Sequence, residues 1–179
     1  MMIFTPGHFP NFPLLLNFLL FQFGWFACVL TPVTTSVAVT MTILIFHFLI
    51  MGNRKDLPLL LLCISTGFIF DSLLQIFGLM DFRGDTLFQP VWLTCLWVLF
   101  AITIPHSLAV FFQFGKWFCF ASGFTSAPLS YLAGVKLDAA SFAYNQTHTL
   151  IFIGIAWGLL MLLYRQAWLR YQPALLNAQ

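Results

Sequence analysis

The sequence predicts an all-α, polytopic transmembrane helical bundle, and three observations support this fold class. Hydrophobic residues make up 61% of the 179-residue chain, and its mean hydropathy is +0.95. Only 7% of the residues are charged, whereas soluble domains average about 25%. Long apolar runs follow one another with short polar breaks between them. A chain of this composition cannot cover a soluble surface, and it lacks the basic face that a nucleic-acid-binding domain needs.

The lengths of the apolar runs predict the number of membrane crossings. A spanning helix uses about 20 residues, so the chain has room for about six spans and for no separate soluble domain. We divide it into an N-terminal segment on the membrane surface (1–13), a transmembrane domain (14–171) and a short cytoplasmic tail (172–179). The six predicted spans are 14–30, 33–51, 57–80, 90–113, 117–137 and 149–169.

Proline or polar residues separate the first four spans. Thr31-Pro32 ends the first span, because proline cannot continue a hydrogen-bonded helix, and the second span begins at once. This spacing predicts a tight helical hairpin. Residues 52–56 form a polar break before the third span, and residues 81–85 after it are interpreted as a solvated turn. Pro90 is well placed in the first turn of the fourth helix.

The last two spans differ in regularity. Gly123 and Pro128 predict that the fifth helix is interrupted, because the proline frees the carbonyl group of Phe124 from its helical bond. In lipid, such a carbonyl needs another partner or lines a water-filled cavity. Interrupted helices form binding sites in some transporters, although many are simple kinks. The sixth helix carries Gly154 and Gly158, whose spacing is typical of a helix-packing face, most simply an internal one.

The distribution of Lys and Arg predicts how the chain sits in the membrane. With six spans, five basic residues fall on one side of the membrane, and Arg83 and Lys136 fall on the other. The side richer in Lys and Arg is expected to be cytoplasmic, which places both termini inside. The basic residues on that side are Arg54, Lys55, Lys116, Arg165 and Arg170.

Asp71 is the one charged residue well inside a predicted span. An aspartate in mid-helix costs about 2.5–3.5 kcal/mol on insertion scales, so it must be neutral, paired or facing water. It either serves a direct function or holds helices together, with Gln22 of the first helix or a backbone carbonyl as its partner. Helical spacing places it in a stripe that we expect to face the bundle interior. The other residues of the stripe are Cys63, Gly67, Gln75 and Gly78.

His47 and His106 form the second group of candidates, because both are expected about 7 Å to the cytoplasmic side of the bilayer centre. Hydroxyl residues neighbour both histidines, among them Ser107. Interhelical hydrogen bonding, worth about 1 kcal/mol, is the simpler interpretation. Ligation of haem or a metal ion is the alternative, but we expect no Cys or carboxylate at that depth as a further ligand. Asp71 is expected about 10 Å away along the membrane normal.

Further polar candidates lie on the first and fifth helices. Asn17 lies closer to the cytoplasmic end of the first helix than to its middle, and we expect its side chain to form a hydrogen bond to a neighbouring helix. Tyr131 completes the set of residues that we assign to a polar cavity, together with the adjacent Ser130. Small residues recur every four positions on the fifth helix, which predicts a ridge that lets another helix approach closely. This ridge consists of Ser122, Ser126, Ser130 and Gly134.

The sequence contains no motif of a well-characterised chemistry. We find no H-E-x-x-H, no G-x-S-x-G and no phosphate loop. The four cysteines lie in apolar runs without a C-x-x-C pair, and we interpret them as small hydrophobic residues. We therefore predict no cofactor, apart from the haem or metal alternative at His47 and His106.

Several stretches of the chain form a recognisable combination. They are Asn17–Val29 (NFLLFQFGWFACV), Phe70–Leu74 (FDSLL), Pro90–Trp92 with Leu96–Ala101, His106–Leu108 and Ala127–Gly134 (APLSYLAG). With these residues the chain resembles, over nearly its whole length, the bacterial integral-membrane family DUF2878. The resemblance implies a multi-pass protein of the bacterial inner membrane whose function is unknown, and it implies no reaction.

Three functions remain open from the sequence. The favoured one is binding or transport of a small molecule, or proton-coupled transport, through a polar cavity around Asp71, with the interrupted fifth helix as a gate. The second is an intramembrane lipid-modifying enzyme or enzyme subunit that uses His47 or His106. The third is a structural or accessory subunit of a membrane complex. The expected partners are the lipid bilayer, an unknown small solute or lipid, and either a second copy of the chain or another membrane protein, but no nucleic acid.

Overall fold

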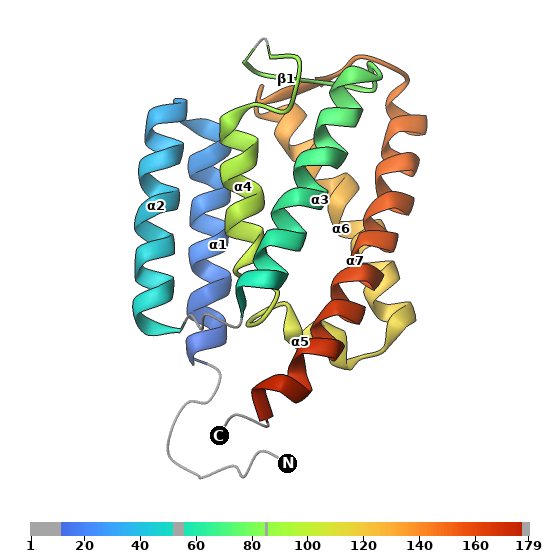
Figure 1. Cartoon of the computed structure of the whole chain (residues 1–179). Coiled ribbons are helices and arrows are strands. Elements are labelled where there is room, and N and C mark those ends of the chain that lie inside the picture. The colour runs from blue at the N-terminus through green and yellow to red at the C-terminus, as the bar shows by residue number, and fades with distance from the viewer. Residues whose placement is uncertain (1–11, 52–55, 85, 177–179) are drawn as a thin grey trace.

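The chain folds into an all-α bundle of apolar helices, as predicted (Figure 1). The computed structural model describes residues 12–51, 56–84 and 86–176. Four of the described helices, α1, α2, α3 and α7, are long and apolar enough to cross a membrane. In chain order the elements are α1 (Phe12–Leu30), α2 (Val33–Ile50), α3 (Leu57–Ile76), β1 (Met80–Phe82), α4 (Val91–Ala101), α5 (Ala109–Gln113), α6 (Lys116–Lys136), β2 (Ala140–Phe142) and α7 (Gln146–Leu176).

Some predicted features lie outside the described residues. They are most of the surface segment (1–11), Arg54 and Lys55 of the first polar break, Asp85 of the turn after the third span, and the end of the tail (177–179). Helix α7 continues to Leu176, beyond the predicted end of the sixth span at residue 169.

Figure 1 shows the long helices running along one common direction, with β1 at one end of the bundle and the short α5 at the other. Helices α1 and α2 form the predicted hairpin, and only Thr31 and Pro32 separate them. At the end of α1 the Ala27 carbonyl accepts two bonds from Thr31, one from its hydroxyl at 2.7 Å and one from its backbone N–H at 3.1 Å. Large apolar side chains on the outside of the bundle are exposed, such as Leu49 on α2, as expected for a surface that faces lipid.

The fourth predicted span is not one continuous helix, and this prediction is wrong. Helix α4 ends at Ala101, turns cover residues 102–108, and α5 follows with five residues. Pro105 has no backbone N–H group to donate to a helical bond, and the residues around it use shorter bonds instead. For example, the amide of Ile104 donates to Ala101 and that of His106 donates to Thr103, three residues back in each case.

The fifth predicted span, in contrast, is unbroken, so the interruption that we expected near Gly123 and Pro128 is also wrong. Helix α6 runs from Lys116 to Lys136 with Pro128 inside it. A Cβ atom added at Gly154 of α7 would lie 2.9 Å from the carbonyl oxygen of Phe124, the group that Pro128 leaves without its helical donor. The absence of a side chain at Gly154 therefore makes room for this carbonyl, and α6 remains helical.

Glycines allow α6 and α7 to pack closely. A Cβ atom at Gly123 would lie 2.6 Å from the carbonyl oxygen of Trp157, and one at Gly158 would lie 2.6 Å from the ring of Phe120. The packing face predicted from Gly154 and Gly158 is therefore internal to the chain.

Two short strands join the loops at the β1 end of the bundle. Strands β1 and β2 pair antiparallel, with Asp81 opposite Ser141. From the sequence we interpreted residues 81–85 as a solvated turn. Asp81 is indeed exposed, but Met80 and Phe82 on either side of it are buried. The pairing links the end of α3 to the end of α6, the two helices that carry Asp71 and Tyr131.

Candidate functional site

A groove along the side of the bundle has a cavity volume of about 730 Å³. Helices α1, α4 and α6 form its walls, and α3 and α7 contribute to its base. Its aromatic lining includes Trp25, Trp92, Trp97, Phe100 and Trp157. Its polar lining consists of Gln22, Asp71, Thr103, Ser107, Ser122, Thr125, Ser126, Ser130 and Tyr131.

Asp71 lies at the base of this groove, and its side chain is 0% exposed. The indole N–H of Trp97 donates to its Oδ2 atom at 2.5 Å, and the hydroxyl of Tyr131 donates to its Oδ1 atom. Trp157 in turn donates to the Tyr131 oxygen at 3.5 Å, and its ring stacks on Trp97 with centroids 4.9 Å apart. Residues from four helices thus surround the carboxylate.

Gly67 lies one turn before Asp71, and its lack of a side chain leaves room for the Trp97 ring beside the carboxylate. A Cβ atom at Gly67 would lie 2.0 Å from the Trp97 ring, so the indole lies directly over the α3 backbone. Cys63, Gly67 and Asp71 of the predicted stripe are buried. Gln75 is not part of the groove lining, because its amide donates to the backbone carbonyl of Thr86 in the loop before α4. Gly78 is exposed beyond the end of α3.

The rim of the groove connects α1 to α6. The indole N–H of Trp25 donates to the hydroxyl oxygen of Ser130 at 3.1 Å. Gln22, which we expected to bond Asp71, is exposed and lines the groove, and the carboxylate is bonded by Trp97 and Tyr131 instead. That expectation is wrong, because the position beside Asp71 is occupied by aromatic donors.

The predicted small-residue ridge of α6 also has a different role from the one we expected. All four of its residues line the groove. A Cβ atom added at Gly134 would meet nothing within 4 Å, so no helix packs against that position. The small side chains keep this space open, and close helix packing uses the Gly123 face of α6 instead.

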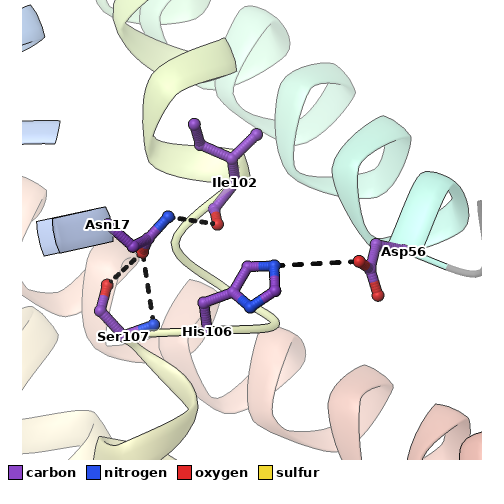
Figure 2. A network of polar contacts seen from close by, with 5 residues as sticks. All are labelled: Asn17, Asp56, Ile102, His106 and Ser107. Atoms are coloured by element: carbon purple, nitrogen blue, oxygen red, sulfur yellow. Dashed lines mark hydrogen bonds and ion pairs between the residues drawn. The ribbon is translucent and has the colours of Figure 1, made fainter. Parts of the chain in front are cut away.

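A second polar cluster lies at the break between α4 and α5. The rings of His47 and His106 approach with centroids 4.9 Å apart, although α2 and the break are far apart in sequence. Figure 2 shows His106 directed toward Asp56 at the start of α3, and its Nε2 atom lies 3.9 Å from Asp56 Oδ2. Our expectation that no carboxylate lies near the histidines is therefore wrong. His47 is 0% exposed, and neither of its ring nitrogens has a hydrogen-bond partner among the described residues.

Asn17 holds the broken segment of the fourth span against α1 (Figure 2). Its amide nitrogen donates to the carbonyl of Ile102 at 3.2 Å. Its side-chain oxygen accepts bonds from the hydroxyl of Ser107 at 2.6 Å and from the Ser107 amide at 3.3 Å. Backbone groups that lack helical partners at the break are thus satisfied by one buried side chain from another helix.

The structure distributes the predicted cavity residues over three places. Asp71, Tyr131, Gln22, Ser130 and Ser107 line the groove, and Asn17 lies behind Ser107. The two histidines lie in the second cluster, and Gln75 lies in neither place. Within the described residues, no group of three or more His, Cys, Asp or Glu side chains has an arrangement that could hold a metal ion.

Sequence reasoning missed the aromatic donors and Asp56. Trp97, Trp25 and Trp157 looked like ordinary apolar residues of their spans, and Asp56 looked like part of a solvated break. A signal did exist for the tryptophans, because a buried indole usually finds an acceptor for its N–H group. Asp71 was the one carboxylate in a span that could serve as that acceptor.

The apolar helices, the lipid-compatible surface and the intramembrane polar clusters define a helical membrane protein. Residues 14–163 match the family model described as "Protein of unknown function (DUF2878)". The chain belongs to this family, as the resemblance in its sequence suggested. No curated protein and no solved structure is significantly similar to the chain.

Proposed function

We propose that the protein binds a small amphipathic molecule from the bilayer in the groove between α1 and α6, as the first step of its transport. The observation that carries this proposal is a cavity of about 730 Å³ whose walls are largely aromatic and whose base holds a carboxylate. Ligand sites are typically apolar cavities with a few placed polar groups.

The position of the groove favours a ligand that arrives from lipid. Its rim includes exposed apolar side chains, among them Phe26 on α1 and Leu129 on α6. Along α1 the lining extends from Phe18 to Val29, about 16 Å at 1.5 Å per residue. This length suits an alkyl chain or a ring system with one polar head, and Asp71 with Tyr131 would hold the head.

Photolabelling in phospholipid nanodiscs tests the proposal. An uncharged alkyl maltoside with a photoactivatable group in its chain should label α1, α4 and α6 around the groove more strongly than α2. Ser126→Trp should fill the groove and reduce this labelling. Thr42→Trp is a matched control, because Thr42 is exposed on α2 and bonds its own helix as Ser126 does. Equal labelling of all lipid-facing helices, unchanged by Ser126→Trp, would overturn the proposal.

We also propose the topology derived from the basic residues: six crossings of the bacterial inner membrane, with both termini in the cytoplasm. In this assignment α4 with α5 is the fourth crossing. Lys116 begins α6 at the α5 end of the bundle, and Lys136 ends α6 at the β1 end. Introduced cysteines tested with a membrane-impermeant thiol reagent in intact cells would check it. Labelling at Lys116→Cys but not at Lys136→Cys would contradict this orientation.

The second cluster favours one alternative function, an intramembrane enzyme that uses His47 and His106. The supporting observation is that the two rings lie together beside Asp56, an arrangement in which a carboxylate could orient one histidine for general-base chemistry. A change in the lipid composition of cells that express the protein, lost in His106→Gln but kept in Asp71→Asn, would favour this alternative over ligand binding at Asp71.

A further inference from the structure

The charge in the groove has one sign. Asp71 is the only acidic side chain among the described lining residues, and Lys, Arg and His are absent from them. A ligand with a negatively charged head would therefore meet a carboxylate and no compensating cation. The absence of a compensating cation disfavours anionic heads, because an uncompensated charge is costly in a site that is shielded from water.

The aromatic lining residues have already used their hydrogen-bond donors. Trp97 and Tyr131 donate to Asp71, Trp25 donates to Ser130, and Trp157 donates to Tyr131. Trp92 donates to the backbone carbonyl of Arg83 at 2.9 Å. The half-buried rings of Trp25, Tyr131 and Trp157 can contact a ligand, and the N–H and O–H groups of all five side chains are occupied within the protein.

The hydroxyl groups of α6 are used in the same way. Ser122, Thr125 and Ser126 each donate to a carbonyl of their own helix, at 2.8, 2.8 and 2.6 Å. Their oxygen atoms keep free lone pairs, and these residues line the groove. Among the described lining residues, the amide of Gln22 and the hydroxyl of Ser130 are left with a donor to spare. The groove is therefore rich in acceptors and poor in donors.

We propose that the ligand of this groove is an amphipathic amine in its protonated form, with its ammonium group bound at Asp71. This inference rests on the proposed function and names the class of its substrate. Each Asp71 oxygen accepts one bond from the protein and retains acceptor capacity, but the side chain is 0% exposed. An N–H group of the ligand therefore reaches it once the Trp97 or Tyr131 side chain turns aside. The half-buried rings of Trp25 and Trp157 in the lining attract a cation, and the apolar walls hold its hydrocarbon part.

Competition against the uncharged photoprobe tests the head group directly. Four competitors share a decyl chain: decylamine, decyltrimethylammonium, decyl sulfonate and decyl maltoside. In nanodiscs of zwitterionic lipid, decylamine should displace the probe at least about tenfold more effectively than decyl sulfonate, since hydrogen bonds to charged groups contribute about 1.5–3 kcal/mol. Decyltrimethylammonium should fall between them, because it has the charge but no N–H donor.

The variant Asp71→Asn tests whether Asp71 causes the preference for decylamine. Asp71→Asn should abolish the advantage of decylamine, so that decylamine and decyl maltoside displace the probe equally. Asp81→Asn is the matched control, because Asp81 is exposed on β1 and does not line the groove. The ranking of the four competitors on the unmodified protein tests the proposal even if Asp71→Asn does not fold.

The outcomes distinguish the amine assignment from the proposed binding function on which it rests. Groove labelling that all four compounds displace equally, or that decyl sulfonate displaces best, would overturn the amine assignment and leave the proposed function standing. Equal displacement by decylamine and decyltrimethylammonium would contradict the requirement for N–H donors. If the probe never labels the groove, the proposed function itself fails.

Discussion

The two polar clusters of this protein satisfy their buried groups in opposite ways. At Asp71 both carboxylate oxygens accept hydrogen bonds from aromatic side chains on α4 and α6. At His47 both ring nitrogens are buried, and the part of the chain that the structure describes offers them no hydrogen-bond partner, although the ring lies against His106. The first cluster joins α3, α4 and α6 beside the groove, and the second brings His47 of α2 against the break between α4 and α5.

This difference indicates what each cluster can contribute. A buried carboxylate with two well-placed donors joins helices and still has acceptor capacity for a ligand. A buried imidazole without partners is destabilising, so its presence needs a reason other than stability. Changes at the first cluster should therefore weaken the fold, whereas removal of His47 should not.

Asp71→Ala should give the largest loss of stability. It removes two hydrogen bonds and leaves the N–H of Trp97 and the O–H of Tyr131 without an acceptor, at a cost of about 1–3 kcal/mol for each buried donor. Thermal unfolding in detergent, followed by size-exclusion chromatography, measures the change. Asp81→Ala should stay within about 0.5 kcal/mol of the unmodified protein, since Asp81 is exposed on β1. Equal effects of the two substitutions would contradict the role of Asp71 in joining helices.

Gly67→Ala should destabilise the same cluster by overpacking. The new methyl group would lie 2.0 Å from the Trp97 ring, so the indole must move away from α3, at a cost of about 1–3 kcal/mol. Gly134→Ala provides a matched control on α6, where the methyl group meets nothing within 4 Å and should stabilise the helix by about 0.5–1 kcal/mol. The two melting temperatures should shift in opposite directions, and a stabilising Gly67→Ala would show that Trp97 does not pack there.

Asn17→Ala should have a moderate effect at the other end of the bundle. It removes three hydrogen bonds to the broken segment, and interhelical bonds in membranes average about 0.6 kcal/mol each. Hydrogen exchange of the Ser107 amide should increase in this variant. Gln22→Ala on the same helix is the comparison, because Gln22 is exposed, and it should leave that amide protected. Unchanged exchange in Asn17→Ala would mean that the segment holds its shape without the clamp.

His47→Leu should have the smallest effect on stability, and we expect it to be neutral or slightly stabilising. The substitution removes two buried nitrogens that have no partner and replaces them with apolar surface, and such an exchange can be close to neutral. The melting temperature should stay level or rise, in contrast to Asp71→Ala. A clear loss of stability would show that His47 has a partner in the membrane, such as an ordered water, that compensates its nitrogens.

The fold class could be predicted from the sequence because it depends on local composition. The α1–α2 hairpin followed directly from Thr31-Pro32, and the membrane class followed from the scarcity of charge. The state of the fourth and fifth helices could not be predicted in this way, because each contains one proline in its interior and the two prolines have different outcomes. Pro105 lies at a break that Asn17 stabilises, whereas Pro128 lies in a helix whose free carbonyl fits against Gly154. The sequence around each proline does not show which residue of another helix packs against it.

The candidate site could likewise be predicted only in part. The sequence by itself singled out Asp71 and the two histidines, since polar groups in apolar spans are conspicuous for their insertion cost. Their partners depend on the tertiary structure, which places Trp97 and Tyr131 beside Asp71 and places Asp56 beside His106. Hydrophobic composition determines that a helix enters the membrane, because each residue contributes independently. Hydrogen bonds and cavities depend on distances between helices that are remote in the chain, so the groove and its donors exist only once those helices have packed.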